Sequence, residues 1–322
     1  MKRRALLAGL LATTTASALP AAEANKVYRL AASGFSRPFW TGILDGLHQL
    51  GYTEGENLVA DQYDVKGLPD FAGVARNMLR TKPDVIVLGP DNQLISQIAN
   101  EASTIPIVAV IPSLAAGLVR NIARPEGNIT GITGDAGIEM QGKQLDILQQ
   151  AIPSISRIAY LSNRDDWEGP WGHAVQAAGA ASGTSIIGIP VEHSADEPEY
   201  RRVFETMVQR SAEALIVSGL PPNFYHRELI SELAFEYRLP SICWFVDTVK
   251  NAHGLLSYAP DYSDFPDRVA KSVDKVLKGT KIADIPVFQP TKFILAINLK
   301  TASALGLQIP SRLLAQADEV IE

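Results

Sequence analysis

The sequence has a single cysteine and no cluster of basic residues, and each shortage excludes a class of structure or partner. Among the 322 residues only Cys243 carries a thiol, so no disulfide can form within the chain. Cys243 lies in the apolar run 241–245, where a free cysteine typically packs as a small hydrophobic side chain. The net charge is −6 and no Lys/Arg block occurs. Because nucleic-acid phosphates require a basic face, we expect no nucleic-acid partner.

Sequence motifs of catalysis are missing as well. The chain has no G-x-x-x-x-G-K-[ST] and no G-x-G-x-x-G after a strand, so the common phosphate-binding loops are absent. It also lacks the G-x-S-x-G motif of a serine nucleophile. Its 5 histidines are scattered singly, without the spacing of metal ligands. We therefore expect no catalytic residues, no metal and no cofactor. An enzyme assembled from distant residues is the less favoured alternative.

The first 24 residues have the pattern of an export signal. Three basic residues at 2–4 precede an apolar stretch at 5–18, which leads to Ala22-Glu23-Ala24. A positive start, a short apolar region and a small-x-small site are typical of a cleaved signal peptide, and the stretch is too short to span a bilayer. We expect cleavage near Ala24 and a periplasmic protein. No cysteine follows the apolar stretch, so we do not expect a lipoprotein. Arg3-Arg4 fits the twin-arginine signal only in part, which leaves Sec or twin-arginine export open.

After the signal segment, strand-like and helix-like segments alternate. Short β-branched apolar runs are typical of strands that are buried on both faces of a parallel sheet, and the intervening segments have helical periodicity. This alternation predicts an α/β fold made of βαβ units. Strands are expected at 27–33, 58–63, 85–89, 105–111, 157–162, 185–191, 214–218, 241–245, 255–258 and 292–299, and helices at 70–81, 91–103, 136–151, 197–210, 223–238, 264–278 and 300–305.

The alternating pattern occurs twice, which predicts two doubly wound parallel-sheet lobes. The first run of units ends near Thr130 and a second begins at Arg157. Further elements follow the second run, so we expect the chain to cross between the lobes several times and to form a multi-strand hinge. The expected division is residues 25–132 with about 262–286 in the first lobe, and 133–261 with about 287–322 in the second.

A binding site is expected at the carboxyl ends of the strands, where ligands lie in open parallel sheets. Loops at these ends contain hydroxyl and amide groups that can orient a polar ligand, and aromatic side chains that can form apolar walls. Free N–H groups at helix starts and an arginine could hold a carboxylate. The candidate ligand-binding residues are Ser33, Phe35, Asp91, Asn92, Ser113, Thr133, Asn163, Arg164, Trp167, Trp171, Gly219, Phe245 and Asp261.

Several short segments carry a family resemblance that is weak in each and specific as an ordered set. They extend over essentially the whole chain after the signal segment. They are GYTEGEN at 51–57, KPDVIV at 82–87, TIPIV at 104–108, RPEGNITG at 124–131, QPTKF at 289–293, INLKTA at 297–302 and ADEVI at 317–321.

Together these segments resemble the ABC-transporter substrate-binding family that includes tryptophan- and tyrosine-type uptake proteins. The resemblance implies a periplasmic-binding-protein fold, a ligand enclosed between the lobes, and delivery to an ABC permease in the inner membrane. The pocket loops depart from the family. Pro90-Asp91 stands where threonine is common, and 219–222, Gly-Leu-Pro-Pro, stands where amino-acid binders place an acidic residue.

We therefore expect a monomeric periplasmic binding protein that captures a small solute by hinge closure. The expected ligand is a carboxylate with an apolar or aromatic body, and an aromatic amino acid is one candidate. A ligand-sensing receptor domain for a membrane signalling partner is the alternative, because the same fold serves both roles.

Overall fold

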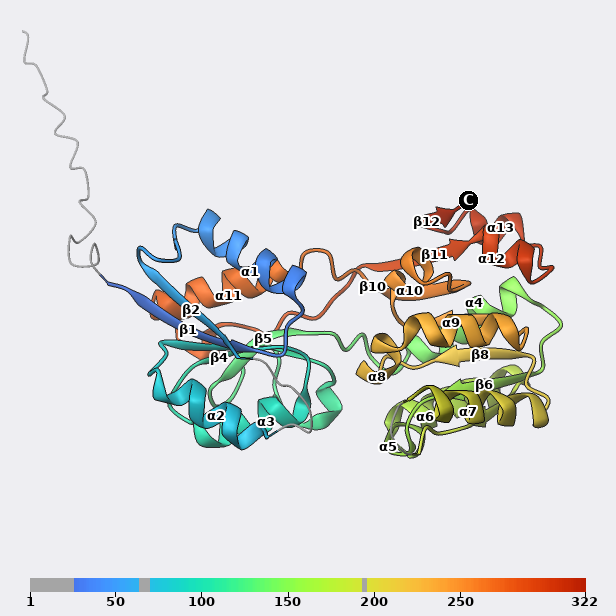
Figure 1. Ribbon diagram of the computed structural model, residues 1–322, viewed down its shortest axis with the longest axis horizontal. Coiled ribbons are helices and arrows are strands. Elements are labelled where there is room, and N and C mark those ends of the chain that lie inside the picture. The colour runs from blue at the N-terminus through green and yellow to red at the C-terminus, as the bar shows by residue number, and fades with distance from the viewer. Residues whose placement is uncertain (1–25, 64–69, 193–195) are drawn as a thin grey trace, which may run out of the picture.

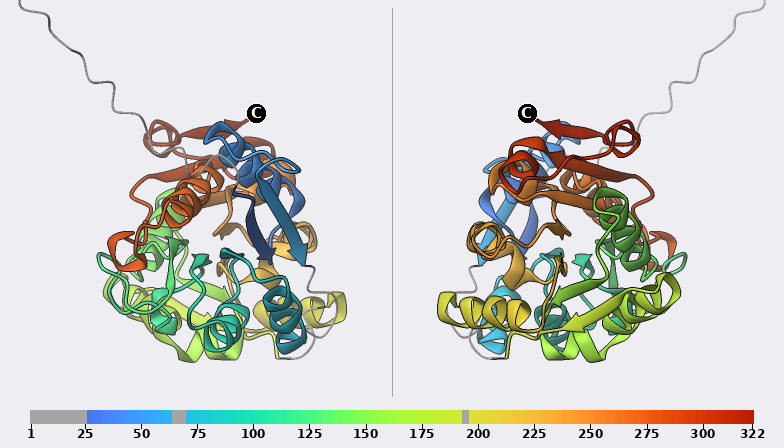
Figure 2. Two further views of the ribbon diagram at one scale, coloured as in Figure 1. Left: turned by 90° about the vertical axis from the view of Figure 1, so that its left-hand side faces the viewer. Right: turned by 90° about the vertical axis from the view of Figure 1, so that its right-hand side faces the viewer.

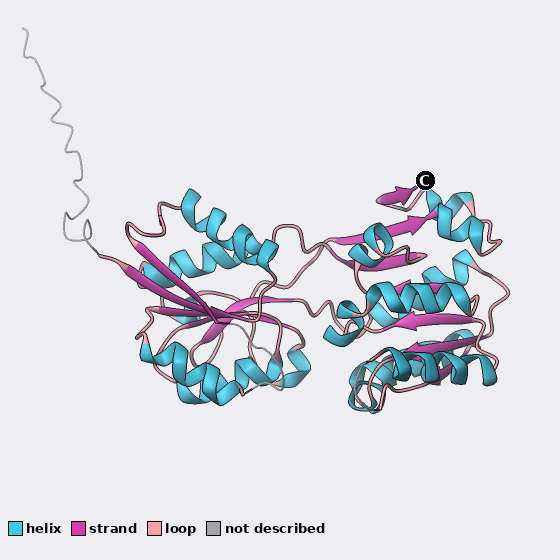
Figure 3. Ribbon diagram, in the orientation of Figure 1, coloured by secondary structure: helices cyan, strands magenta, loops and turns pink. Residues whose placement is uncertain are grey.

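The computed structural model describes residues 26–63, 70–192 and 196–322. The expected signal peptide, 1–24, lies outside these residues. Two lobes lie side by side along the long axis of the molecule (Figure 1), and each consists of one sheet with helices on both faces (Figure 3). This architecture confirms the predicted α/β fold with two parallel-sheet lobes. Within the described ranges, no helix is long and apolar enough to cross a membrane.

Lobe 1 is built on a fully parallel sheet of five strands. Strand β3 is buried at all four positions, as expected for an apolar run covered on both faces. Helices α1 (Arg37–Gln49) and α11 (Phe265–Leu277) pack together over one face, and α2 (Phe71–Arg80) and α3 (Asn92–Glu101) cover the other (Figure 1). In sheet order the strands are β2 (Leu58–Tyr63), β1 (Tyr28–Ser33), β3 (Val85–Leu88), β4 (Ile107–Ile111) and β5 (Ile129–Thr133), and a 3-10 turn, η1 (Leu114–Ala116), follows β4.

Lobe 2 is built on a seven-stranded sheet in which only the β10–β11 pair is antiparallel. In sheet order its strands are β12 (Glu319–Ile321), β11 (Phe293–Asn298), β10 (Leu256–Pro260), β9 (Ser241–Cys243), β8 (Ala214–Val217), β6 (Arg157–Leu161) and β7 (Ser185–Gly188). Helices α4 (Met140–Ala151), α6 (Pro170–Ser182), α12 (Leu299–Ala304) and α13 (Ser311–Leu314) share one core cluster with the sheet, and α7 (Glu197–Gln209) and α9 (Arg227–Glu236) share the other. The short helices α5 (Arg164–Glu168), α8 (Pro221–Tyr225) and α10 (Val246–Asn251) follow β6, β8 and β9.

Three chain segments cross between the lobes: 134–139 after β5, 261–264 after β10, and 289–292 before β11 (Figure 1). Hydrogen bonds tie them together. The Gln289 Nε2 donates to the Asp135 carbonyl at 3.1 Å, and the Asp261 N–H donates to the Lys292 carbonyl at 2.9 Å. The lobes are therefore joined by three mutually bonded segments.

The division of the chain follows from these crossings. The two end-on views show lobe 1 in front on the left and lobe 2 in front on the right, each with helices around its sheet (Figure 2). Thr133 is the last residue of β5, and Val287 packs in a core cluster of lobe 1. The division expected from the sequence, 25–132 with about 262–286 in the first lobe, stays a prediction.

Several elements differ from the sequence prediction, and local backbone geometry explains two of them. Strand β5 was not expected, because it contains Gly131, which has φ 132 and whose Cβ would lie 2.1 Å from the Ala109 carbonyl oxygen. Only glycine fits this position. The single helix expected over 223–238 is two helices, because His226 leaves the helical conformation between α8 and α9 with φ −101 and ψ 19. Strand β12 was also not expected, and α4 starts at Met140 rather than 136.

Candidate ligand-binding site

The carboxyl ends of the parallel strands lie on the sides where the two lobes face each other. Helix α3 follows β3 at the side of lobe 1 nearest lobe 2, and α5 and α8 follow β6 and β8 at the side of lobe 2 nearest lobe 1 (Figure 1). The sequence-predicted site residues lie at or near these strand ends.

In lobe 1, the loops after β1 and β3 are held together through their backbones. The Gly89 N–H donates to the Ser33 carbonyl at 2.8 Å, and a Cβ on Gly89 would lie 1.9 Å from the Gly34 carbonyl oxygen. Ser33 is fully buried, and its hydroxyl donates to the Tyr63 carbonyl at 2.7 Å. Phe35 is half-buried and stacks on Phe39 with ring centroids 5.3 Å apart. Ser33 therefore shapes the loop, and Phe35 offers a ring.

Asp91 and Asn92 have different roles at the start of α3. The Asp91 Oδ1 accepts from the N–H groups of Gln93 and Leu94, each at 2.9 Å, so Asp91 is the N-cap of α3, a position that favours aspartate. The Asn92 Oδ1 is buried and has no hydrogen-bond partner among the described residues. A buried acceptor without a partner is costly, so Asn92 is the group of lobe 1 best suited to accept a hydrogen bond from a ligand.

The loop after β4 is fixed by Asp135, which the sequence had not indicated. The Asp135 carboxylate is 6% exposed and accepts from the Leu114 N–H at 2.8 Å, the Ser113 hydroxyl at 3.3 Å and the Gly137 N–H at 2.8 Å. The Thr133 hydroxyl accepts from the Asp135 N–H at 2.9 Å and donates to a β4 carbonyl at 3.0 Å. Ser113 and Thr133 are thus brought together, and Asp135 joins them to the first crossing.

In lobe 2, Trp244 is the centre of an aromatic group that includes two predicted residues. Its ring meets Trp171 edge to face at a centroid distance of 5.4 Å, and a Cβ on Gly219 would lie 2.8 Å from it. Its indole Nε1–H donates to the Tyr262 hydroxyl at 2.9 Å. Trp244 is 7% exposed. The sequence named Trp171 and Gly219 but did not select Trp244, which connects them.

Phe245 belongs to a second aromatic group, at the tip of α8. It meets Phe224 edge to face at 4.8 Å, and the Arg227 guanidinium lies 4.8 Å from the Phe224 ring centroid. The Arg227 Nε is 2.8 Å from an Asp247 carboxylate oxygen, so this arginine is already paired.

Helix α5 brings Asn163, Arg164 and Trp167 together, but each has a structural partner. The Asn163 side chain accepts from the Asp166 N–H at 2.8 Å and caps α5. Arg164 forms ion pairs with Glu168 and Glu192. The Trp167 ring packs on β7, where a Cβ on Gly188 would lie 2.1 Å from it.

Two carboxylates of lobe 2 lie near these loops, in opposite environments. The Tyr160 hydroxyl donates to the Asp166 Oδ2 at 2.9 Å, and burial raises the pKa of Asp166 above its usual value despite this hydrogen bond. Asp261 lies 2.7 Å from the Lys292 ammonium and accepts from the Ser263 N–H at 3.0 Å. The Lys292 bond lowers the pKa of Asp261 to about 2. Asp261 is therefore a charged group that already holds a cation.

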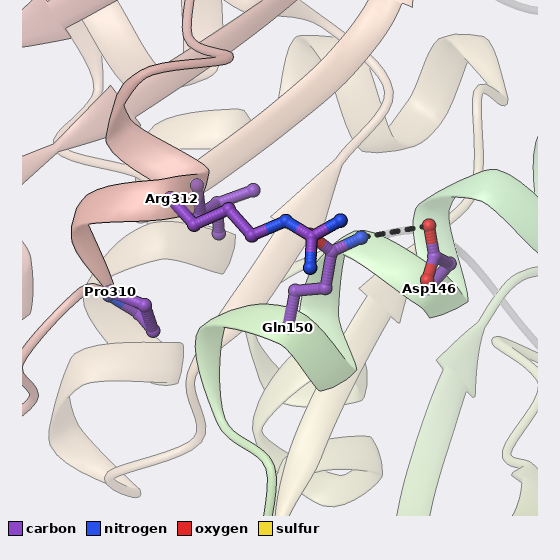
Figure 4. A pocket seen from close by; sticks show the side chains of 5 residues that line it. Asp146, Gln150, Pro310 and Arg312 are labelled. Carbon is purple, nitrogen blue, oxygen red and sulfur yellow. Dashed lines mark hydrogen bonds between the residues drawn. The ribbon is translucent and has the colours of Figure 1, made fainter.

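A recess elsewhere on lobe 2 contains none of the predicted residues. It lies between α4 and the α13 region, and the Gln150 Nε2 within it donates to the Asp146 Oδ2 at 2.9 Å (Figure 4). No group of three metal-ligating side chains occurs in the part of the chain that the structure describes.

Comparisons with known proteins agree with this architecture. The sequence profile of the family described as "ABC transporter substrate binding protein" matches residues 37–321. A tyrosine-binding protein of Clostridioides difficile (strain R20291) is 23% identical over 278 residues, which cover 83% of this chain and 76% of that protein.

Two solved structures share the fold at low sequence identity. A conserved domain protein from Vibrio cholerae superposes with a TM-score of 0.81 at 21% identity, covering 92% of this chain and 100% of that chain. The ABC domain in complex with L-Trp from Streptococcus pneumoniae superposes with a TM-score of 0.80, also at 21% identity and with the same coverage of both chains.

Proposed function

Because the chain belongs to the family of ABC transporter substrate-binding proteins, we propose that it is the solute-binding component of an ABC uptake transporter. It captures a small carboxylate with an apolar or aromatic body and delivers it to a permease in the inner membrane. The protein acts as a monomer in the periplasm, to which the signal pattern at residues 1–24 directs it. It returns the ligand unchanged, because its role is capture and release.

The observation that carries the ligand class is the Trp171–Trp244 pair at the strand ends of lobe 2. Two indole rings held edge to face at 5.4 Å, with Trp171 half-buried and Trp244 7% exposed, form a rigid apolar wall. The half-buried Phe35 ring occupies the corresponding strand end of lobe 1. A ligand that contacts both sides needs an apolar or aromatic body. The relatives described as binding tyrosine and L-Trp are consistent with such a body.

The start of α1 supports a carboxylate on this ligand. Its N-cap residue, Ser36, makes no side-chain hydrogen bond to the first turn, whereas Asp91 caps α3 with its carboxylate. A helix start without a side-chain cap leaves first-turn N–H groups for an anion; in α1 the second helical residue, Pro38, has no N–H, so its neighbours would provide them. Phe35 directly precedes the N-cap Ser36. The carboxylate of a ligand could therefore bind the helix start while its ring contacts Phe35.

The carboxylates near the site already have partners, which limits the groups that could bind an amine on the ligand. Asp261 is paired with Lys292 and Asp166 with the Tyr160 hydroxyl, so neither offers an unengaged carboxylate. The partnerless Asn92 carbonyl oxygen accepts from an ammonium or from a neutral N–H or O–H donor. The site accordingly accepts an aromatic amino acid and also an aromatic acid without an amine.

The three crossings supply the hinge for capture. Rotation about a few connecting residues closes two lobes around a ligand in such folds. The bonds of Gln289 to Asp135 and of Lys292 to Asp261 keep the crossings in register, so the lobes move as two bodies.

Thermal melting of the protein from residue 25 onward tests the proposal against aromatic amino acids, aromatic acids and short aliphatic acids. A ligand of the native state at 100 times its Kd adds about 2.7 kcal/mol of stability, which raises the melting midpoint. We expect the aromatic compounds to raise the midpoint and the short aliphatic acids to have a much smaller effect.

Two variants control this experiment. Trp171→Ala should abolish the shift caused by aromatic compounds. Phe235→Ala removes a ring that is 51% exposed on α9 and should leave the shift intact. A shift with aliphatic acids alone, or no shift with any compound, would contradict the proposal.

A further inference from the structure

Tyr262, in the second crossing, contacts lobe 1 through its ring, and it contacts lobe 2 and the first crossing through its hydroxyl group. Its ring packs against the core of lobe 1 and meets Phe265 edge to face at a centroid distance of 4.9 Å. Its hydroxyl accepts the indole N–H of Trp244 in lobe 2 at 2.9 Å. The same hydroxyl donates to the Gly134 carbonyl at 3.5 Å. A single side chain thus contacts lobe 1, lobe 2 and the first crossing.

The bond to Tyr262 fixes the orientation of Trp244. An indole has one N–H donor, and here that donor is used within the protein. Gly219 leaves the space that one side of the Trp244 ring occupies, since a Cβ there would lie 2.8 Å from the ring. The Trp171 ring lies nearly perpendicular to it, with the two centroids 5.4 Å apart. The Trp244 N–H is therefore not available to a ligand, and a ligand that reaches this residue meets its ring.

The Tyr262 hydroxyl is suited to this double role. Burial raises the pKa of Tyr262, so the group stays protonated and can donate and accept at once. Phenylalanine at this position would keep the ring against Phe265 and lose both hydrogen bonds. The hydroxyl can thus be removed without removing the packing.

We propose that Tyr262 is a positioning residue that couples the lobe arrangement to the aromatic side of the ligand site. Through its bond to Trp244 it holds the Trp171–Trp244 pair at one angle to lobe 1, so that closure brings these rings against the ligand. Selection of aromatic over aliphatic ligands then depends on a hydroxyl that does not touch the ligand. The ligand part of this inference rests on the proposed function.

Tyr262→Phe tests the coupling first in the ligand-free protein. The chain has 4 tryptophans, so its indole N–H groups give a small set of nitrogen–proton resonances, and Trp244→Phe identifies the one from Trp244. We expect hydrogen exchange at the Trp244 indole to be about threefold to tenfold faster in Tyr262→Phe, the factor that one net hydrogen bond contributes. Tyr258→Phe is the matched control, because Tyr258 lies in β10 and its ring stacks on Phe293. It should leave this exchange unchanged.

Titration of the same variants tests the selection of ligands. We expect Tyr262→Phe to bind an aromatic acid about threefold to tenfold more weakly, with the affinity for a short aliphatic acid unchanged. Tyr258→Phe should retain both affinities.

Each other outcome decides against the coupling. Unchanged exchange at Trp244 would overturn the positioning role, and an equal loss of affinity for both ligand classes would reduce Tyr262 to a general structural residue. If no compound binds the unmodified protein, the proposed function fails, and the exchange comparison alone decides whether Tyr262 positions Trp244.

Discussion

Gly89→Ala should strongly destabilise lobe 1, because the loops after β1 and β3 touch through their backbones at this residue. A Cβ on Gly89 would lie 1.9 Å from the Gly34 carbonyl oxygen and 2.4 Å from its carbonyl carbon. Real Cβ atoms do not approach other atoms so closely, and a backbone carbonyl cannot rotate aside as a flexible side chain can. The two loops must therefore separate.

The structure sets the size of the effect. Separation breaks the bond from the Gly89 N–H to the Ser33 carbonyl, which is 2.8 Å long and contributes about 1 kcal/mol. Overpacking of a close contact costs about 1–3 kcal/mol more. We expect the free energy of unfolding to fall by about 2–4 kcal/mol, which at about 2–4 °C per kcal/mol corresponds to a drop of about 4–16 °C in the melting midpoint.

Chemical and thermal denaturation of the variant, followed by circular dichroism, measures this loss. Gly51→Ala is the control: Gly51 has φ 94 and no atom lies within 4 Å of its Cβ position, so it tests backbone strain alone, at about 1 kcal/mol. Gly89→Ala should be the more destabilised of the two and should also bind ligand more weakly, because Ser33 and Phe35 move with the loop. If Gly89→Ala is no less stable than Gly51→Ala, the close loop contact is wrong.

Three further predictions concern single side chains. Burial raises the pKa of Cys243 to about 12, so iodoacetamide at about pH 8 should modify this thiol only after unfolding, as mass spectrometry would show; rapid modification of the native protein would contradict the burial. The pKa of Asp261 is lowered to about 2 by Lys292 from an unfolded value near 3.9, so its stabilisation is complete above about pH 4 and is lost as the pH falls towards 2. Asp261→Asn should flatten that part of the stability–pH profile, and an unchanged slope would refute the pairing. Arg164→Ala should alter neither the urea midpoint nor ligand affinity measurably, because exposed ion pairs contribute little and Glu192 already engages the guanidinium; a large loss of affinity would show that Arg164 leaves Glu192 to bind the ligand.

The fold was predictable because its signals are local. Runs of β-branched residues identified the buried strands, and the bounds predicted for β2 (Leu58–Tyr63) are those in the structure. The sequence pattern failed to predict an element where the backbone of a single residue differs from that of its neighbours. Gly131 conceals β5 because glycine in a strand is a poor indicator of extended structure. His226 divides the helix predicted over 223–238 without any proline or glycine to announce the break.

The place of the candidate site was predicted from a general rule, that ligands bind at the carboxyl ends of the strands in open parallel sheets, and the predicted residues lie at or near those ends. Asp91 and Asn163, both predicted from the sequence to contact the ligand, cap α3 and α5 in the structure. What sequence could not supply was contacts between distant residues. Asp135 reaches Ser113 across 22 positions and Trp244 reaches Tyr262 across 18, and neither separation has a periodic signature.

Two tryptophans of lobe 2 pack directly against glycines that are distant in the sequence. They show why ligand specificity is hard to predict from sequence alone. Trp167 lies over Gly188 and Trp244 over Gly219, at distances that exclude any Cβ. The orientation of each ring therefore depends on a residue that has no side chain to contact a ligand. Trp167 packs on β7, which leaves two aromatic groups at the strand ends of lobe 2, Trp171 with Trp244 and Phe224 with Phe245. On the proposed function, a side chain at Gly219 should therefore alter ligand selection just as a change at Trp171 should, because both residues contact the Trp244 ring.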